Sequence, residues 1–351
     1  METTKFAVLG FGGAGRAHAQ RLQAMKGAEV KVIYDPKMPA LGQAIRNYPD
    51  IHFTDKLDNV FLGEVDAVSI CTPDHTHFEY AKLAVQNKLH TLVEKPMFVT
   101  QKQCVEMEKI LEDNKVVFGV HHQMRYIPTF RGAYELVRKG MLGEILTIEA
   151  DYIHDMRHRS FAFDDWRIDR ENPQNIVLGG LSHAIDLMRW IVGEDVEETF
   201  SFAGQKGWRE YPDIDTVIAL MRFKSGTLGK GTMTISSAGP QRNTLAIYGT
   251  HGQIHNNIFR DADGAISFIR KPDLSFKQNI FIKFITPFLK QSPSILRDYP
   301  FSIYEHDSAC QELLLDFVSA IRTGDQFPIG FDEGSKTVQL CLRVIEAYKN
   351  H

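Results

Sequence analysis

The chain has few of the features that mark secreted or membrane-bound proteins. Its four cysteines (Cys71, Cys104, Cys310 and Cys341) lie far apart and form no CxxC pair, which argues against a disulfide framework and favours reduced thiols in a cytoplasm. No run approaches the roughly 20 apolar residues that a membrane-spanning helix needs, and the N-terminus lacks the basic and apolar regions of a signal peptide. A formal net charge of −4 gives no electrostatic reason to expect nucleic acid or an anionic membrane as a partner. We therefore expect a cytoplasmic globular protein.

What the chain does have is enough length for two domains. It holds 351 residues, of which 43% are hydrophobic and 24% charged, so each of two domains of ordinary size can bury a core. The first third alternates short β-branched runs with helical stretches, which predicts βαβ units and a doubly wound parallel sheet of the Rossmann type. Strands are expected at 5–9, 29–34, 65–71, 90–93 and 116–120, and helices at 14–25, 76–87 and 102–113.

After about residue 125 the pattern changes to one typical of an α+β domain with a large, mainly antiparallel open sheet. Breaks such as Ser225-Gly226 and His251-Gly252 predict a meander of antiparallel strands. Strands are expected at 145–153, 216–223, 227–236, 245–248 and 265–269, helices at 131–138, 180–192, 307–323 and 334–348, and loops at 155–175 and 279–300. We therefore divide the chain into domains at 1–122 and 123–351.

A glycine-rich turn between the first strand and helix carries the first functional signal. The segment is a GxGxxG made of Gly10, Phe11, Gly12, Gly13, Ala14 and Gly15. In such a turn the first glycine permits the bend, the second lets the backbone approach a pyrophosphate, and the third lets helix and strand pack closely. The diphosphate of a dinucleotide then rests on the positive end of the helix.

The end of the second predicted strand indicates which dinucleotide. Asp35 lies 20 residues after Gly15, where a carboxylate can accept hydrogen bonds from the adenosine ribose hydroxyls and repel the 2′-phosphate of NADP. The next residue is Pro36 and not an arginine that would grip that phosphate, although Lys37 follows. We therefore predict NAD over NADP.

Glu94 and Lys95 follow the fourth predicted strand at its carboxyl end, where doubly wound sheets bind their ligands. Hydride transfer from an alcohol requires a group that takes the hydroxyl proton, and a lysine can do so when burial and a nearby cation lower its pKa. Lys95 is the candidate for that group.

These residues carry a family resemblance. The segments GFGGAGRAH (10–18), CTPDHTH (71–77), VEKP (93–96) and GGLSHAIDLMRW (179–190), together with Asp35, resemble the Gfo/Idh/MocA oxidoreductases over nearly the whole chain. The resemblance implies a Rossmann domain, a second domain whose open sheet often forms the contact of a homodimer or homotetramer, and a lysine at the EKP position that donates and accepts a proton. It also implies cofactor contacts from Cys71, Thr72, Pro73, His75, Glu94 and Gln123, and a substrate site that includes Arg125, Tyr152 and Arg167, with His154 as a further pocket candidate.

The helix predicted at 180–192 supplies the second candidate catalytic group. Helical spacing places Gly179, His183, Asp186 and Trp190 on one face, opposite an apolar stripe of Leu181, Ile185, Met188 and Val192. We expect this face to close the cofactor cleft, with His183 touching the reacting hydroxyl and Asp186 orienting the helix or His183. Many members of the family carry an aspartate four residues before this histidine, whereas this chain has Gly179, so Lys95 and His183 remain as the catalytic pair.

The sequence thus predicts an NAD-dependent oxidoreductase acting on a secondary hydroxyl of a sugar, inositol or related polyol. Two alternatives stay open: a lyase or glycosidase that recycles NAD through a 3-keto sugar, and a regulator that binds NAD without turnover. No metal site is expected, because the histidine pairs 75/77, 121/122 and 154/158 lack a third ligand at a fitting spacing.

Overall fold

The N-terminal half is a parallel sheet of six strands in the order β3-β2-β1-β4-β5-β6. The computed structural model describes residues 3–37, 48–62, 64–157, 166–172, 174–269 and 303–350. The strands are β1 (Thr4–Leu9), β2 (Ala28–Tyr34), β3 (His52–Thr54), β4 (Ala67–Ile70), β5 (His90–Val93) and β6 (Phe118–Val120). The main helices are α1 (Gly13–Gln23), α3 (Asp58–Leu62), α4 (His77–Gln86) and α5 (Gln101–Glu112). The predicted Rossmann fold is confirmed, with β3 and α3 as additions that the sequence patterns did not indicate.

The strand order explains where a ligand can bind in this half. The central strands consist of apolar and β-branched residues because helices cover both faces of the sheet, as β4 shows with all four residues buried. The order changes direction between β1 and β4, and in such sheets the crevice at the carboxyl ends of these strands holds the ligand. The glycine turn follows β1, Cys71 follows β4 and Glu94 follows β5. Three predicted motifs therefore meet at one edge of the sheet.

The second half is built on an eight-stranded sheet in the order β14-β13-β12-β11-β7-β10-β9-β8. Its strands are β7 (Ile145–Ile153), β8 (Val196–Gly204), β9 (Thr216–Phe223), β10 (Leu228–Thr234), β11 (Arg242–Gly249), β12 (Gly252–His255), β13 (Ile258–Asp261) and β14 (Ile266–Phe268). The mainly antiparallel sheet is confirmed, but the simple meander is wrong in one place. The early strand β7 inserts between β10 and β11, and it runs parallel to β10.

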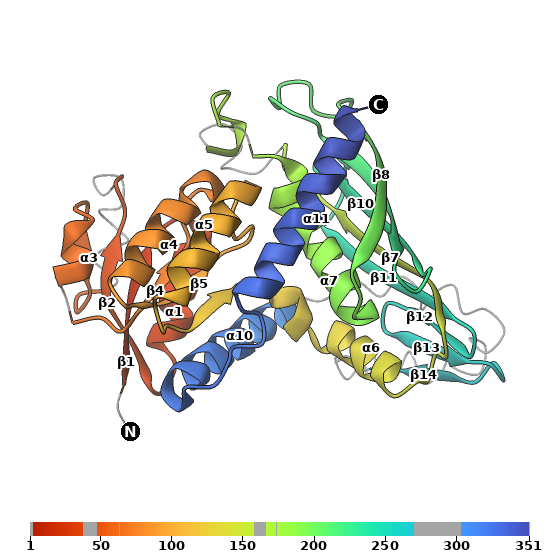
Figure 1. Cartoon of the computed structure of the whole chain (residues 1–351), viewed down its shortest axis with the longest axis horizontal. Coiled ribbons are helices and arrows are strands. Elements are labelled where there is room, and N and C mark those ends of the chain that lie inside the picture. The colour runs from red at the N-terminus through yellow and green to blue at the C-terminus, as the bar shows by residue number, and fades with distance from the viewer. Residues whose placement is uncertain are drawn as a thin grey trace.

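Helices cover one face of this large sheet (Figure 1). They are α6 (Pro128–Arg138), a π-helical turn at Val177–Leu181 that continues into α7 (Ser182–Val192), and α11 (Phe331–Lys349). Residues of β9 alternate accordingly, so that Val217 and Ala219 are buried while Ile218 and Leu220 are exposed on the other face. Helix α7 is buried over most of its surface, because Leu181, Ile185 and Met188 of its predicted stripe and also His183 and Asp186 are buried, while Val192 at its end is partly exposed. The amphipathic pattern of α7 therefore does not divide a core side from a solvent side, because most of its apolar face and the polar residues His183 and Asp186 are all buried.

The long helix α10 (Ile303–Thr323) returns to the N-terminal half (Figure 1). The ring of its Phe317 lies 6.5 Å from that of Phe6 in β1, and its Asp307 forms a 2.8 Å ion pair with Arg21 of α1. The predicted helices 307–323 and 334–348 are therefore present, while the predicted loop 279–300 lies outside the described residues. The proposed boundary at 122/123 stays a prediction.

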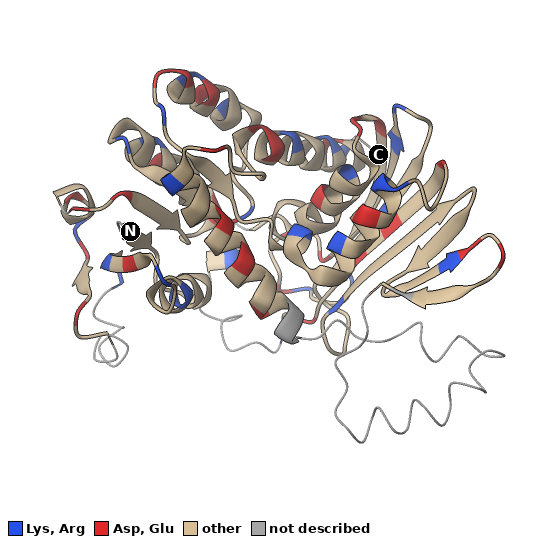
Figure 2. Ribbon diagram, turned by 90° about the horizontal axis from the view of Figure 1, so that it is seen from below, with Lys and Arg blue, Asp and Glu red and all other residues tan. Residues whose placement is uncertain are grey.

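Charged residues do not gather by sign in the ribbon. Figure 2 shows acidic and basic residues interspersed along the helices. Among the described segments, no helix has both the length and the apolar character that crossing a bilayer requires.

Candidate active site

The glycine turn has the backbone that a diphosphate needs. Gly10 adopts a φ of +88°, and a Cβ there would lie 2.7 Å from the carbonyl oxygen of Cys71. A Cβ on Gly15 would lie 1.8 Å from the carbonyl oxygen of Gly10, so only glycine lets α1 pack this closely. At Gly12 and Gly13 a Cβ would meet nothing within 4 Å. Those two positions leave open space in front of the first N–H groups of α1, and the turn fits a pyrophosphate.

Asp35 is tied to this turn. Its Oδ2 accepts a hydrogen bond from the backbone N–H of Phe11 at 2.8 Å, and its Oδ1 accepts one from the N–H of Lys37 at 2.8 Å. The carboxylate is thus held beside the glycine turn. This position agrees with the predicted contact between Asp35 and the adenosine ribose hydroxyls.

One cavity of about 500 Å³ runs from the glycine turn to α7. It brings together most of the predicted site residues: Gly12, Gly13, Ala14, Cys71, Thr72, Glu94, Lys95, Gln123, Tyr152, Arg167 and His183. Six of the predicted cofactor-binding residues are not part of its lining. Gly10, Phe11 and Gly15 belong to the glycine turn, Asp35 is bonded to that turn, and Pro73 and His75 lie next to the lining residues Thr72 and Asp74 in the chain. Lys37, which the sequence raised as a doubt about NADP, does line it.

Lys95 enters this cavity from the end of β5. Its Nζ donates a 2.6 Å hydrogen bond to the carbonyl oxygen of Gly179, and its backbone N–H donates to Oε2 of Glu94. Burial lowers the pKa of Lys95, although the carboxylates of Glu94 and Asp74 act in the opposite direction. A lysine whose pKa is lowered can lose and regain its proton nearer to neutral pH.

His183 faces the same cavity from α7. Its ring stacks on that of Tyr152, with centroids 5.1 Å apart, and Tyr152 stacks in turn on His154. Burial holds the pKa of His183 well below its ordinary value, and Lys95 and His122 act in the same direction. The imidazole is therefore neutral at pH 7. Its Nδ1 is buried without a hydrogen-bond partner among the described residues.

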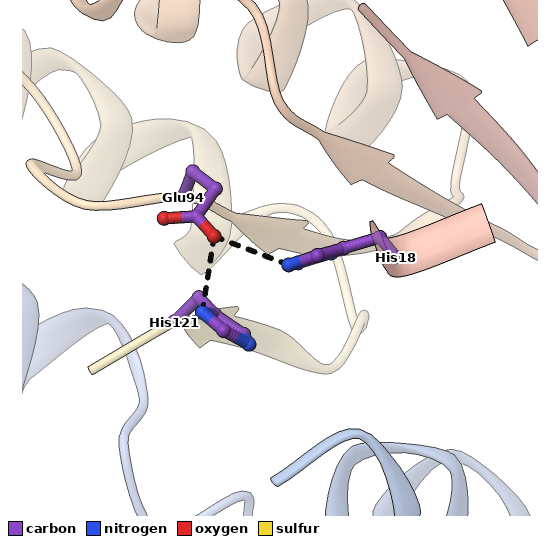
Figure 3. A group of neighbouring side chains, drawn as sticks. All are labelled: His18, Glu94 and His121. Carbon is purple, nitrogen blue, oxygen red and sulfur yellow. Dashed lines mark hydrogen bonds and ion pairs between the residues drawn. The ribbon is translucent and has the colours of Figure 1, made fainter. Parts of the chain in front are cut away.

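A buried triad supports the EKP segment from behind (Figure 3). The Oε1 of Glu94 lies 3.1 Å from Nε2 of His18 and 3.1 Å from Nδ1 of His121. Burial alone would raise the pKa of Glu94, but His121 and His18 hold it well below its ordinary range. His18 is fixed on its other side by a 2.7 Å hydrogen bond to Ser69 of β4. Glu94 therefore stays ionised and anchors the backbone of Lys95.

The same three side chains are the group in the described part of the chain whose ligand-type atoms lie close enough to hold a metal ion, all within 4.8 Å of one another. Sequence spacing gave no sign of this group, because its members come from α1, from the end of β5 and from the end of β6. The contacts within it are those of one carboxylate oxygen that lies 3.1 Å from a nitrogen of each of two imidazoles. The expectation that no metal binds stays a prediction.

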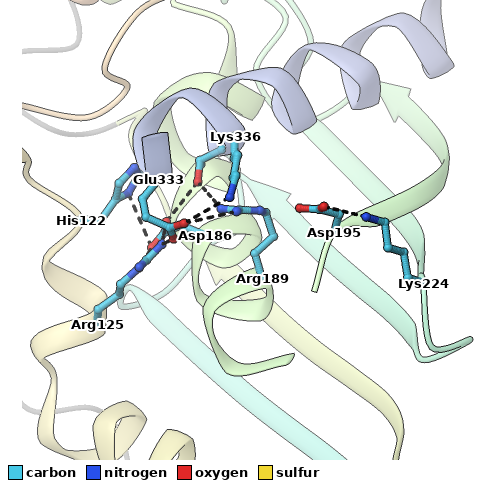
Figure 4. Close-up of polar contacts among 9 residues, drawn as sticks. His122, Arg125, Asp186, Arg189, Asp195, Lys224, Glu333 and Lys336 are labelled. Carbon is cyan, nitrogen blue, oxygen red and sulfur yellow. Dashed lines mark hydrogen bonds and ion pairs between the residues drawn. The ribbon is translucent and has the colours of Figure 1, made fainter. Parts of the chain in front are cut away.

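Arg125 and Asp186 pair with each other and are not part of the cavity lining (Figure 4). The guanidinium of Arg125 donates to both carboxylate oxygens of Asp186 at 2.8 and 2.6 Å, and to Glu333 of α11 at 2.7 Å. Burial opposes charge on Asp186, but Arg125 and His122 hold its pKa well below its ordinary range. These contacts tie η3 (Gln123–Tyr126), α7 and α11 together. Trp190, expected on the cleft face, stacks instead on Tyr134 of α6 at 4.1 Å.

Several lining residues were missed from the sequence. Asp74 stands inside the quoted CTPDHTH segment, but no role was assigned to it. Trp208 and Tyr211 come from a loop between predicted elements, which Asp215 shapes by accepting three backbone hydrogen bonds from residues 206–208. His306, which is not part of the lining, reaches the lining residue Gln123 from α10, with the two side-chain nitrogens 3.3 Å apart. Only Asp74 had a local signal, namely its place in the loop after β4.

The fold and the site together define a dinucleotide-dependent oxidoreductase. Comparison with known proteins gives the family: residues 4–122 match the profile of the GFO/IDH/MocA oxidoreductase family with its NAD-binding Rossmann fold, and residues 130–255 match the GFO/IDH/MocA C-terminal domain. The chain belongs to this family, and its first half is an NAD-binding domain.

Curated relatives and solved structures agree with this assignment. The chain is 24% identical to levoglucosan dehydrogenase of Pseudarthrobacter phenanthrenivorans over 76% of this chain and 77% of that one. It is 25% identical to myo-inositol 2-dehydrogenase of Thermotoga maritima (73% and 76%), and 24% identical to 2,7-anhydro-N-acetylneuraminate hydratase of Mediterraneibacter gnavus (72% and 67%). A solved levoglucosan dehydrogenase in complex with NADH has the same fold, with a TM-score of 0.81 at 20% identity, covering 99% of this chain and 98% of that one.

Proposed function

We propose that this oxidoreductase transfers a hydride between NAD and a secondary hydroxyl or ketone of a sugar, inositol or related polyol. The observation that carries the proposal is the single cavity that joins the glycine turn to Lys95 and His183. Its lining includes aromatic side chains with polar groups, among them Tyr152, Trp208 and Tyr211. Such amphipathic walls suit a ligand with both C–H faces and hydroxyl groups.

The protein's own groups divide the proton work. NAD supplies the hydride acceptor when it is bound. Lys95, held by the carbonyl of Gly179, takes the hydroxyl proton in its neutral form and returns it in the reverse direction. His183 stays neutral in its buried setting and offers a ring nitrogen to the same hydroxyl. Relatives named as sugar and inositol dehydrogenases support this class of substrate.

The test is a screen of NAD with a panel of free sugars, anhydro sugars and inositols, followed by absorbance at the NADH band. We expect NADH to form with at least one polyol. The relative named as a hydratase keeps the lyase alternative in view: a new product without net NADH would favour it. NAD binding with no product from any member would favour the regulator, although Lys95 and His183 in one cavity argue against that role.

We predict that Asp35→Asn widens the cofactor preference. The variant keeps an acceptor for the N–H of Phe11 but removes the charge that repels a 2′-phosphate. Affinity for NADP should rise about tenfold, the equivalent of 1.4 kcal/mol, while affinity for NAD falls slightly. Calorimetric titration of both cofactors measures this, with the exposed Asp58→Asn on α3 as control. An unchanged ratio of the two affinities would remove Asp35 from cofactor selection.

We also propose a homo-oligomer formed through the exposed face of the large sheet. Phe202 and Phe200 of β8 stand opposite Ile218 and Leu220 of β9, and all four are exposed, Phe202 to 65%. An apolar row of this kind on a water-facing sheet marks a protein contact. We expect Phe202→Glu to lower the mass measured by light scattering after gel filtration. Leu62→Glu on α3, which alters an even more exposed apolar residue far from this face, should leave that mass unchanged. Equal masses for both variants would exclude this face.

A further inference from the structure

Residue 179, four positions before His183, is a glycine, and the side chain of another residue occupies the space beside it. Gly179 lies in the π-helical turn that leads into α7. A Cβ placed there would lie 2.5 Å from Cδ and 2.6 Å from Nε2 of Gln174. The side chain of Gln174 therefore occupies the space that a side chain at residue 179 would need.

Gln174 is held firmly in that space. Its backbone N–H donates a 3.1 Å hydrogen bond to the carbonyl oxygen of Arg167, and its own carbonyl accepts one from the hydroxyl of Tyr211. Its Nε2 donates a 2.6 Å hydrogen bond to Oδ2 of Asp74. Gln174 thus links the second domain to a carboxylate of the Rossmann half.

Asp74 is the first residue of a short 3-10 turn, η2 (Asp74–Thr76), in the loop after β4. Its exposed fraction is 8%, and it lines the same cavity as Lys95. Lys95 donates to the carbonyl oxygen of residue 179, while Gln174, which occupies the space of a side chain at residue 179, holds Asp74. A buried carboxylate thus shares the cavity with the lysine although residue 179 has no side chain.

We propose that Asp74, which Gln174 holds from the space beside Gly179, is a second carboxylate, besides Glu94, that acts on Lys95 in this chain. The inference rests on the proposed function of Lys95 and extends it. Asp74 is a positioning residue here: it sets the basicity of the lysine, and Gln174 sets the place of Asp74.

The charges around both groups agree with this role. Burial lowers the pKa of Lys95, Glu94 and Asp74 act to raise it, and Arg167 acts to lower it further. Burial raises the pKa of Asp74, while His77, Lys95, Gln174 and Arg167 act against that rise. His183, which also faces Lys95, is neutral, as is His122, whose pKa burial lowers to about 4. Removing the charge of Asp74 should therefore lower the pKa of Lys95 further.

The first test measures this directly in the cofactor-free protein. Lysines are reductively methylated with ¹³C-formaldehyde, and the signal that Lys95→Arg deletes is titrated by NMR. We expect Asp74→Asn to lower the pKa of Lys95 by about one unit, the size of effect that a nearby opposite charge exerts. Asp74→Glu, which keeps the charge, should restore most of the wild-type pKa of Lys95. The exposed Asp113→Asn should leave that pKa unchanged. An unchanged Lys95 titration in a folded Asp74→Asn variant would overturn the inference.

The second test moves the carboxylate to the position where many family members carry it. In the Asp74→Asn background, Gln174→Ala with Gly179→Asp clears the clash at residue 179 and supplies a new carboxylate there. With the substrate found by the panel, we expect Asp74→Asn to lower kcat about tenfold or more, with KM changed less, and to shift the alkaline-rising limb of the oxidation profile to lower pH. We expect the triple variant to recover kcat and to move the rising limb of the pH profile back to its wild-type position.

These outcomes separate the two proposals. If no panel member reacts with the wild-type protein while Asp74→Asn still shifts the Lys95 titration, the proposed reaction fails and the Asp74–Lys95 link stands. If the protein is active but Asp74→Asn lowers kcat without moving either the titration or the pH limb, Asp74 has only a structural role and the inference fails.

Discussion

Lys95→Ala is expected to stop turnover and to leave NAD bound. The variant removes the group that exchanges a proton with the reacting hydroxyl, and general acid–base groups contribute about 10²- to 10⁴-fold to a rate. We expect kcat to fall by roughly that factor. The glycine turn and Asp35, which hold the other end of the dinucleotide, stay intact, so the Kd for NAD should change by about threefold or less, a cost below 1 kcal/mol. Steady-state kinetics and calorimetric titration measure the two effects separately.

Two further variants show whether activity is lost because proton exchange stops or because the positive charge of Lys95 is missing. Lys95→Arg keeps a positive charge in the cavity but cannot release its proton near neutral pH, so it should be as inactive as the alanine variant. Lys102→Ala, an exposed lysine at the start of α5, should behave like the wild type. Undiminished activity in Lys95→Ala would contradict the assignment of Lys95 as the group that exchanges a proton with the substrate. Activity in Lys95→Arg would show that only the charge of Lys95 matters.

Asp186→Ala is expected to cause the largest loss of stability. Asp186 is fully buried and takes two hydrogen bonds from Arg125, a guanidinium whose exposed fraction is 6%. Its removal leaves Arg125 with only the partly exposed Glu333, and breaking a buried ion pair in this way costs about 3–5 kcal/mol. We expect the melting temperature to fall by roughly 6–20 °C, since large domains lose about 2–4 °C per kcal/mol. Differential scanning calorimetry measures this change.

The control is an ion pair on the surface of the same region (Figure 4). Asp195 and Lys224 are 2.9 Å apart, but their side chains are exposed to 55% and 58%. Asp195→Ala should cost about 1 kcal/mol or less. An Asp186→Ala variant no less stable than Asp195→Ala would contradict the account of the network.

The pH dependence of stability gives a second check on Asp186. The pKa of its carboxyl is depressed in the folded protein, so its contribution is present above the unfolded value near 3.8 and is lost as the pH falls below it. The wild type should therefore lose stability more steeply on acidification than Asp186→Ala does.

Much of the fold followed from local patterns in the sequence. The GxGxxG turn, Asp35 and Lys95 are each fixed by a strand that ends beside them, so hydrophobic period and turn chemistry were enough to place them. The large sheet was expected as mainly antiparallel, and it is. The insertion of β7 between β10 and β11 was missed, because pairing between strands some 90 residues apart leaves no mark on either strand alone.

The site was harder to predict where its contacts come from distant segments. Arg125 and Asp186 were expected at the substrate, but a helix period shows only which residues share a face and not what that face meets. The link from Gln174 to Asp74 spans 100 residues, and the triad around Glu94 draws on three elements. Residue types in these positions become informative only once the topology has brought them together.

The return of α10 to the first half has a consequence for how the protein is made. Phe317 packs on Phe6, and a Cβ on Gly119 would lie within about 3 Å of both Phe317 and Phe327. Strand β1, which is synthesised early, and helix α10, which is synthesised about 300 residues later, therefore share one core. During synthesis the strands of the nucleotide domain leave the ribosome first, yet the part of their apolar surface around Phe6 and Gly119 stays uncovered until α10 has followed. The cofactor domain is thus encoded first but completed only after most of the second domain has been made.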